Sequence, residues 1–97
     1  MRINEKLVEI EGQRGTLQIA RCLIDNGETL YCHLYDNNPM VKISNNSTAK
    51  RALNILQKHE LVKKRKSQKR RAIYYKLTKK GERFAKLIME IEKVLNE

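Results

Sequence analysis

The sequence lacks an apolar segment long enough to cross a membrane, because no uninterrupted hydrophobic run approaches the roughly 20 residues that a spanning helix needs. Its first twelve residues contain acids and no apolar core, so we expect no secretory signal peptide. The only cysteines, Cys22 and Cys32, are too few for a disulfide framework. These absences favour a cytoplasmic protein that has no membrane partner.

Catalytic sequence patterns are also missing. There is no phosphate-binding glycine loop, no GxGxxG and no Ser/His/Asp arrangement at a recognisable spacing, so we expect no enzyme. Cys22, Cys32 and His33 could bind a metal only if the fold brought them together, and no CxxC or HxxxH pair supports that role. We therefore expect no metal and no cofactor. Cys22 is interpreted as a core residue, and His59 as part of a helix C-terminal cap.

The positive charge of the chain lies in one block. The 97 residues carry 21 Lys+Arg against 11 Asp+Glu, a formal net charge of +10 at pH 7. Residues 1–57 contribute +1 and residues 84–97 contribute −1, so residues 58–83 hold the whole excess. Such a block is either a solvated basic surface or a footprint for a polyanion. Because charges this dense repel one another without a counter-charge, we favour a nucleic-acid footprint.

The first half of this single domain (1–97) is read as an arm followed by short elements. In residues 1–13 the apolar spacing predicts a helical arm for a partner subunit, with a frayed terminus as the alternative. Residues 16–26 predict a helix. Residues 28–35 fit a second helix, with a strand competing, and after a turn signal residues 40–43 predict a short strand. The stripe expected to be buried in the first core helix is Leu17, Ala20, Leu23 and Ile24.

A helix predicted over residues 44–58 has one apolar and one polar face. Ser and Asn side chains at its start can cap the free backbone N–H groups. Its inward face is expected to consist of Ala49, Ala52, Leu53 and Leu56. The opposite face contains no acid, whereas an ordinary solvated face is rich in Glu and Lys. Because Asn can pair with adenine and Arg with guanine in the major groove, we predict DNA contacts by Asn45, Asn46, Ser47, Thr48, Lys50, Arg51 and Asn54.

Two strands are predicted next, at residues 61–66 and 71–77, around a turn at residues 67–70. Ile73, Tyr75 and Leu77 alternate with polar positions and are expected to face the core. The tip of this hairpin is basic and suits the phosphates or the minor groove of DNA. The predicted backbone contacts are Lys63, Lys64, Arg65, Lys66, Lys69, Arg70 and Arg71.

A last helix is predicted over residues 79–97, with apolar side chains at intervals of three and four. Such a stripe either completes the core of its own chain or pairs with a second copy. Only 40% of the residues are hydrophobic, so the core is small and pairing is favoured. The predicted dimerisation residues are Phe84, Leu87, Ile88, Ile91 and Leu95.

This order of elements resembles the winged helix-turn-helix domain. Residues 47–62, STAKRALNILQKHELV, are similar to the S-T-x-x-R-x-L-x-x-L-x-x-x-G-L-V run of MarR-like and PadR-like transcription regulators. Residues 74–81, YYKLTKKG, are similar to the Y-x-L-T-x-K-G that ends their wing. The resemblance covers about residues 14–97 and is to the compact archaeal or viral form. The chain departs from the family in having His59-Glu60 where a glycine is usual, and in lacking long flanking helices.

The resemblance implies an α+β fold with a three-helix core, a basic β-hairpin wing and a C-terminal dimerisation helix. It implies a recognition helix at about residues 45–58 in the major groove and a wing at about 63–71 on the backbone or minor groove. A homodimeric repressor would then bind double-stranded DNA at an inverted repeat, with recognition helices roughly 34 Å apart. The alternatives are a non-specific architectural DNA- or RNA-binding protein and a protein-interaction module.

Overall fold

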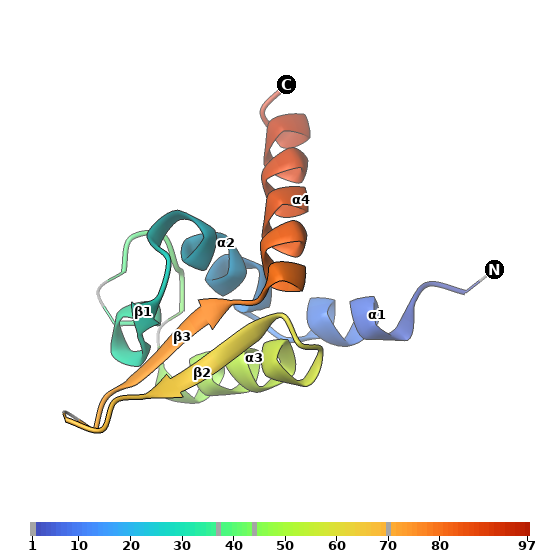
Figure 1. The fold of residues 1–97 in the computed structure, drawn as a ribbon. Helices are drawn as coiled ribbons and strands as arrows, with labels where there is room; N and C mark the ends of the chain where they lie inside the picture. Colours follow the sequence, from blue (N-terminus) through green and yellow to red (C-terminus); the bar gives the residue numbers. More distant parts are fainter. Residues whose placement is uncertain (1, 37, 44, 70) are drawn as a thin grey trace.

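The computed structural model describes residues 2–36, 38–43, 45–69 and 71–97. In Figure 1 the sheet lies in front of one helix, the N-terminal helix projects to the side, and the C-terminal helix stands away from the body. In chain order the elements are α1 (Glu5–Gly12), α2 (Thr16–Asn26), β1 (Thr29–Leu30), the 3-10 helix η1 (Tyr31–Leu34), α3 (Asn46–Lys58), β2 (Val62–Lys66), β3 (Ile73–Leu77) and α4 (Lys79–Leu95).

The sheet is antiparallel, with β3 between β1 and β2. Tyr75 of β3 pairs with Lys64 on one side and Thr29 on the other, and its side chain is buried. The next residue, Tyr74, pairs with Arg65 and Leu30. Since successive side chains of a strand point to opposite faces, the sheet has an inner face at Tyr75 and an outer face at Tyr74.

The core lies between α2, α3 and the inner face of the sheet. The predicted inward residues of α3 are confirmed, because Ala49, Ala52, Leu53 and Leu56 all have 0% exposure. On α3 Ile55 is half-buried at the margin of this face. In the hairpin, Tyr75 is buried and Ile73 and Leu77 are half-buried against the core, which confirms their inward direction.

The buried stripe predicted for α2 is partly wrong, although the helix has the predicted bounds. Leu17 is 42% exposed, and Ile24 is only half-buried. Thr16, Ile19 and Cys22 are buried beside Ala20 and Leu23. The difference arises because α2 packs against both α3 and α4, so its buried face is rotated and wider than a single stripe.

Residues 28–40 also differ from the prediction. The expected two-turn helix is replaced by the two-residue strand β1 and the single 3-10 turn η1. Of the predicted turn, Asn37 lies outside the described residues. The side-chain oxygen of Asn38 accepts a hydrogen bond from the backbone N–H of Met40 at 2.9 Å.

Residues 40–43 are not a strand. Val41 and Ile43 are nevertheless buried in the core. The segment is held against the core by these two side chains and does not join the sheet, in which β3 pairs with β1 and β2.

The remaining elements agree with the predicted α+β winged-helix arrangement. The hairpin of β2 and β3 is closed by the backbone N–H of Ser67, which donates to Ala72 O at 2.8 Å. Arg70 of the predicted turn lies outside the described residues. Among the helices of the described residues, none is long and apolar enough to cross a membrane.

The start of α4 is packed tightly against the end of α3. Thr78 caps α4 by accepting from the backbone N–H of Gly81 at 2.9 Å, and its own hydroxyl donates to Glu60 O at 2.7 Å. A Cβ at Gly81 would lie only 1.8 Å from the carbonyl oxygen of Leu61. This position therefore requires glycine, because the obstacle is backbone.

We predict that Gly81→Ala lowers the free energy of unfolding by at least about 1–3 kcal/mol, the usual cost of overpacking. Thermal or urea unfolding would measure the change. Gly12→Ala is the matched control, because a Cβ there meets nothing within 4 Å and alanine favours helix. Equal stability of the two variants would contradict the tight approach.

Candidate nucleic-acid interface

The polar face of α3 is solvent-exposed along its length. Asn45 is the N-cap, and its side-chain oxygen accepts from the backbone N–H of Thr48 at 2.8 Å. Thr48 is half-buried, so it is the least accessible of the predicted contacts on this helix. The exposed residues of the predicted set are Asn45, Asn46, Ser47, Lys50, Arg51 and Asn54.

A tyrosine holds the N-terminus of α3. The hydroxyl of Tyr31 donates to the side-chain oxygen of Asn46 and lies 3.3 Å from Asn46 O. Its ring packs against Tyr35 and Tyr75, with centroids 5.3 and 6.0 Å away. Partial burial raises the pKa of Tyr31 above its ordinary value, which is already well above neutral, so the hydroxyl is protonated and can donate. Asn46, predicted as a DNA contact, is thus engaged within the chain.

Sequence reasoning missed this role of Tyr31. The sequence predicts a second helix over residues 28–35 and does not indicate a contact between Tyr31 and residues 46–58. The rings of Tyr31 and Tyr35 do meet, but through the 3-10 turn, which directs the hydroxyl of Tyr31 to α3.

A carboxylate holds the other end of α3. Glu9 of α1 accepts from Lys58 Nζ at 2.8 Å and contacts Nε2 of His59 at 2.5 Å. The hydrogen bond from Lys58, followed by that from His59, lowers the pKa of Glu9. His59 is the C-cap residue through its backbone N–H, as expected. Its imidazole, only 9% exposed, additionally connects α3 to α1.

The strand register divides the cations of the wing between two directions. Lys64 pairs with Tyr75 and Lys66 with Ile73, so both point to the inner face, where α3 lies. Lys63 pairs with Lys76 and Arg65 with Tyr74, so these point to the outer face. At the tip, Lys69 and Arg71 are exposed, and Arg70 lies outside the described residues.

Arg65 is occupied by an acidic partner. Its Nε lies 3.0 and 3.1 Å from the two oxygens of Glu28, and its Nη2 lies 2.6 Å from Oε1. The guanidinium carbon also stands 4.6 Å from the ring centre of Tyr74. The ion pair lowers the pKa of Glu28 and raises that of Arg65. Arg65 is therefore held by an ion pair within the chain, whereas the lysines beside it on β2 are exposed.

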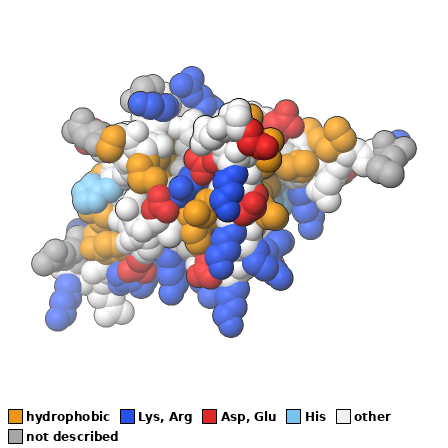
Figure 2. Space-filling model, turned by 90° about the horizontal axis from the view of Figure 1, so that it is seen from above, with side chains coloured by type: hydrophobic (Ala, Val, Ile, Leu, Met, Phe, Trp, Pro, Cys, Tyr) orange, Lys and Arg blue, Asp and Glu red, His pale blue; other side chains and the backbone are white. Residues whose placement is uncertain are grey.

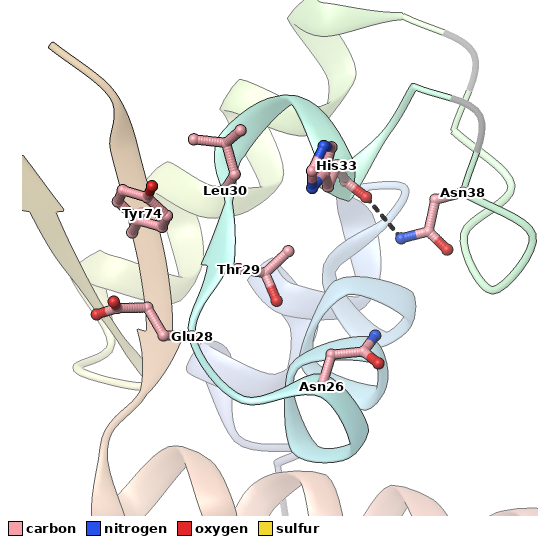
Figure 3. A pocket seen from close by; sticks show the side chains of 7 residues that line it. All are labelled: Asn26, Glu28, Thr29, Leu30, His33, Asn38 and Tyr74. Carbon is pink, nitrogen blue, oxygen red and sulfur yellow. Dashed lines mark hydrogen bonds between the residues drawn. The ribbon is translucent and has the colours of Figure 1, made fainter. Parts of the chain in front are cut away.

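Beside this ion pair lies an open hollow of about 530 Å³, shown in Figure 3. Glu28 and Tyr74 stand on one side of it, and His33 and Asn38 on the other. Asn38 Nδ2 donates to His33 O at 2.6 Å. The full lining is Asn26, Glu28, Thr29, Leu30, His33, Asn38 and Tyr74.

The cysteines do not form a metal centre in the part of the chain that the structure describes, where no cluster of three His, Cys, Asp or Glu side chains is arranged to hold an ion. Cys22 is buried, as predicted, and its Sγ accepts from the side-chain amides of Asn26 at 3.2 Å and Asn38 at 3.4 Å. Cys32 is half-buried in η1.

The residues predicted for dimerisation fall into two groups. Ile88 is buried in its own chain and Phe84 is half-buried against its own core. Leu87, Ile91 and Leu95 are 63%, 54% and 77% exposed. Figure 2 looks down on the α4 side of the molecule and shows Lys and Arg side chains gathered along its lower margin, with hydrophobic side chains between charged ones nearer the centre.

Comparison with known proteins identifies the fold. The chain matches no protein-family model and no curated protein. It is similar to a solved structure of a ZitR double mutant from Lactococcus lactis in its apo form, with 23% identity, a TM-score of 0.65, and coverage of 93% of this chain and 67% of that one. It is also similar to a transcriptional regulator from Clostridium thermocellum, with 19% identity, a TM-score of 0.65, and coverage of 98% and 96%. The chain shares the fold of these proteins.

The contact of Glu9 with Lys58 and His59 predicts a pH-dependent stability. Because the pKa of Glu9 is lower in the folded chain than in the unfolded one, its contribution is complete above pH 4.5 and is lost as pH falls through the folded pKa. Glu9→Gln should therefore lower the melting temperature at pH 7, and the difference from wild type should vanish in acid. Thermal unfolding from pH 7 to pH 3 would measure it.

Glu11→Gln is the control, since Glu11 lies on the same helix and makes no ion pair within the described residues. A difference between Glu9→Gln and wild type that stayed constant down to pH 3 would show that the charge of Glu9 is not its cause.

Proposed function

We propose that this chain is a sequence-specific regulator of transcription that binds double-stranded DNA, acts as a homodimeric repressor and works in the cytoplasm on nucleoid DNA. The observation that carries the proposal is the exposed polar face of α3, which contains no acid. It lies beside the inner face of the hairpin, where Lys64 and Lys66 point. A helix of this diameter fits the major groove, and cations at its side suit the flanking phosphates.

Within this proposal the residues have different tasks. Arg51 and Asn54, with Lys50 beside them, are exposed in the middle of α3 and would reach base edges. Lys64 and Lys66, on the inner face of the wing, would contact the DNA backbone. The similarity to a transcriptional regulator from Clostridium thermocellum supports this assignment, because the fold is shared over 98% of the chain.

The homodimer is supported by apolar side chains that the chain does not cover. On α4, Leu87, Ile91, Val94 and Leu95 are all more than half exposed, at spacings of three and four. On α1, Leu7 and Val8 are 49% and 52% exposed. Both helices project from the body in Figure 1, so a second copy could cover both. Two-fold pairing would place the two α3 helices about 34 Å apart on an inverted repeat.

The proposal is tested by selection from a pool of random duplexes at two salt concentrations, followed by sequencing of the bound fraction. Enrichment of an inverted repeat that survives the higher salt is the expected result. Binding without enrichment that collapses with salt would indicate a non-specific DNA- or RNA-binding protein, because phosphate contacts alone are strongly salt-dependent. Absence of binding at either salt would favour a protein-interaction module.

Base reading and backbone contact predict different mutant behaviour. Arg51→Ala should cost about 1–3 kcal/mol on the selected site and relax specificity there. Lys64→Ala should weaken binding to all sequences alike and lower the slope of log K against log salt by about one. Titration of the selected and a scrambled duplex would measure both. If Arg51→Ala lost the same amount of affinity for the selected and the scrambled duplex, base reading by this residue would be rejected.

Dimerisation through α4 predicts that Ile91→Glu raises the dissociation constant for self-association by at least about tenfold, because an unpaired carboxylate is costly in an apolar interface. Sedimentation equilibrium would measure it, and circular dichroism would check the fold. Met40→Glu is the control, since Met40 is a 41% exposed apolar residue outside both helices. Equal self-association of wild type and both variants would remove α4 from the interface.

A further inference from the structure

The outer face of the sheet contains an ion pair that spans its width. Arg65 belongs to β2 at one edge, and Glu28 immediately precedes β1 at the other. Tyr74 of the central strand lies between them, paired in register with Arg65. Arg65 crosses this ring at 4.6 Å to reach the carboxylate. The pair therefore connects two strands that have no backbone hydrogen bonds to each other.

The geometry of this contact is unusual for a surface ion pair. Arg65 uses two nitrogens on the two oxygens of Glu28, at 2.6 to 3.1 Å, and stacks on an aromatic ring at the same time. Exposed pairs held by a single contact contribute little to stability, whereas bidentate pairs with fixed geometry hold their partners in one orientation. The side chain of Glu28 is 31% exposed and that of Arg65 is 53% exposed, so the pair is open to water and its role rests on its geometry.

The elements joined by this pair are those that bear the proposed DNA contacts. β2 carries Lys64 and Lys66. β1 continues directly into η1, where Tyr31 holds the N-terminus of α3 through Asn46. A continuous path thus runs from the wing through Arg65, Glu28 and Tyr31 to the helix proposed to read bases.

We propose that Arg65 is a positioning residue, which acts through Glu28 to hold the wing at a fixed angle to α3, and that it is not a contact to phosphate. The proposal rests on the proposed DNA-binding function. It follows from the direction of the side chain, since Arg65 points to the outer face while Lys64 and Lys66 point toward the α3 side. It also follows from the hydrogen bonds, because the Nε and Nη2 side of the guanidinium, which could bind a phosphate through two nitrogens, is engaged by Glu28.

The substitution Glu28→Gln separates the two roles by the sign of its effect. If Arg65 were a phosphate contact, removing its acidic partner would free it and tighten binding to any DNA. If Arg65 positions the wing, the same change weakens binding to the cognate duplex, although the protein becomes more positive. We expect a loss on the order of tenfold on the selected duplex, in the range of measured couplings between contacting residues.

A charge swap provides the second test. Glu28→Arg combined with Arg65→Glu keeps the net charge and can restore the pair across Tyr74. Cognate affinity should recover toward wild type in the double variant, while each single change weakens it. Glu82→Gln is the matched control, because it changes the net charge equally. Glu82 is exposed in the first turn of α4, on the side of the helix opposite Leu87 and Ile91, and forms no ion pair within the described residues. This control should leave cognate affinity unchanged or slightly tighter.

A measurement without DNA distinguishes failure of this inference from failure of the proposed function. Residual dipolar couplings of the β2 amides should show a reoriented or mobile wing in Glu28→Gln and a wild-type wing in Glu82→Gln. An unchanged wing, tighter cognate binding by Glu28→Gln, or no recovery in the charge swap would each overturn the positioning role. If wild type bound no duplex while the wing still moved, the DNA-binding function would fall and the structural link would stand.

Discussion

Complete burial of one face of α3 is the interaction on which the rest of the structure depends. Ala49, Ala52, Leu53 and Leu56 all have 0% exposure, and through this face α3 packs against α2 and β2. Burial of each leucine contributes about 1.5–3 kcal/mol relative to its exposure. Because these residues fix the rotation of the helix, its acid-free polar face must point to solvent. The proposed base contacts are thus a consequence of core packing.

The ends of α3 are fixed by polar contacts that come from distant parts of the chain. Tyr31 holds the first turn, and Glu9 holds the last through Lys58 and His59. The wing is fixed separately, by its register on β3 and by the ion pair with Glu28. Together these contacts fix the position of the wing relative to the polar face of α3. A rigid duplex would have to contact both surfaces at once, and fixing them before binding lowers the cost of association.

Much of the fold could be predicted because its main signals are local. The spacing of apolar residues in α3 and α4 and the alternation in β3 are strong patterns, and the structure confirms them. The errors lie where tertiary contacts decide. Helix α2 packs against several elements, which buries Thr16 and Ile19 outside the predicted stripe and leaves Leu17 exposed, and β1 forms because β3 offers an edge. The ion pair beside the site could not be predicted from the sequence, since Glu28 and Arg65 are 37 residues apart and no sequence pattern links them.

The measurement that tests the central claim most directly is a map of the DNA-binding face by amide chemical shifts of the labelled protein, titrated with a mixed-sequence duplex at low salt. Large shifts should occur in α3 from Ser47 to Asn54 and at Lys64 and Lys66, with small ones at Lys63 and Lys76 on the outer face. Shifts concentrated on the outer face or on α4, with α3 unaffected, would contradict the assignment of α3 as the helix that enters the major groove.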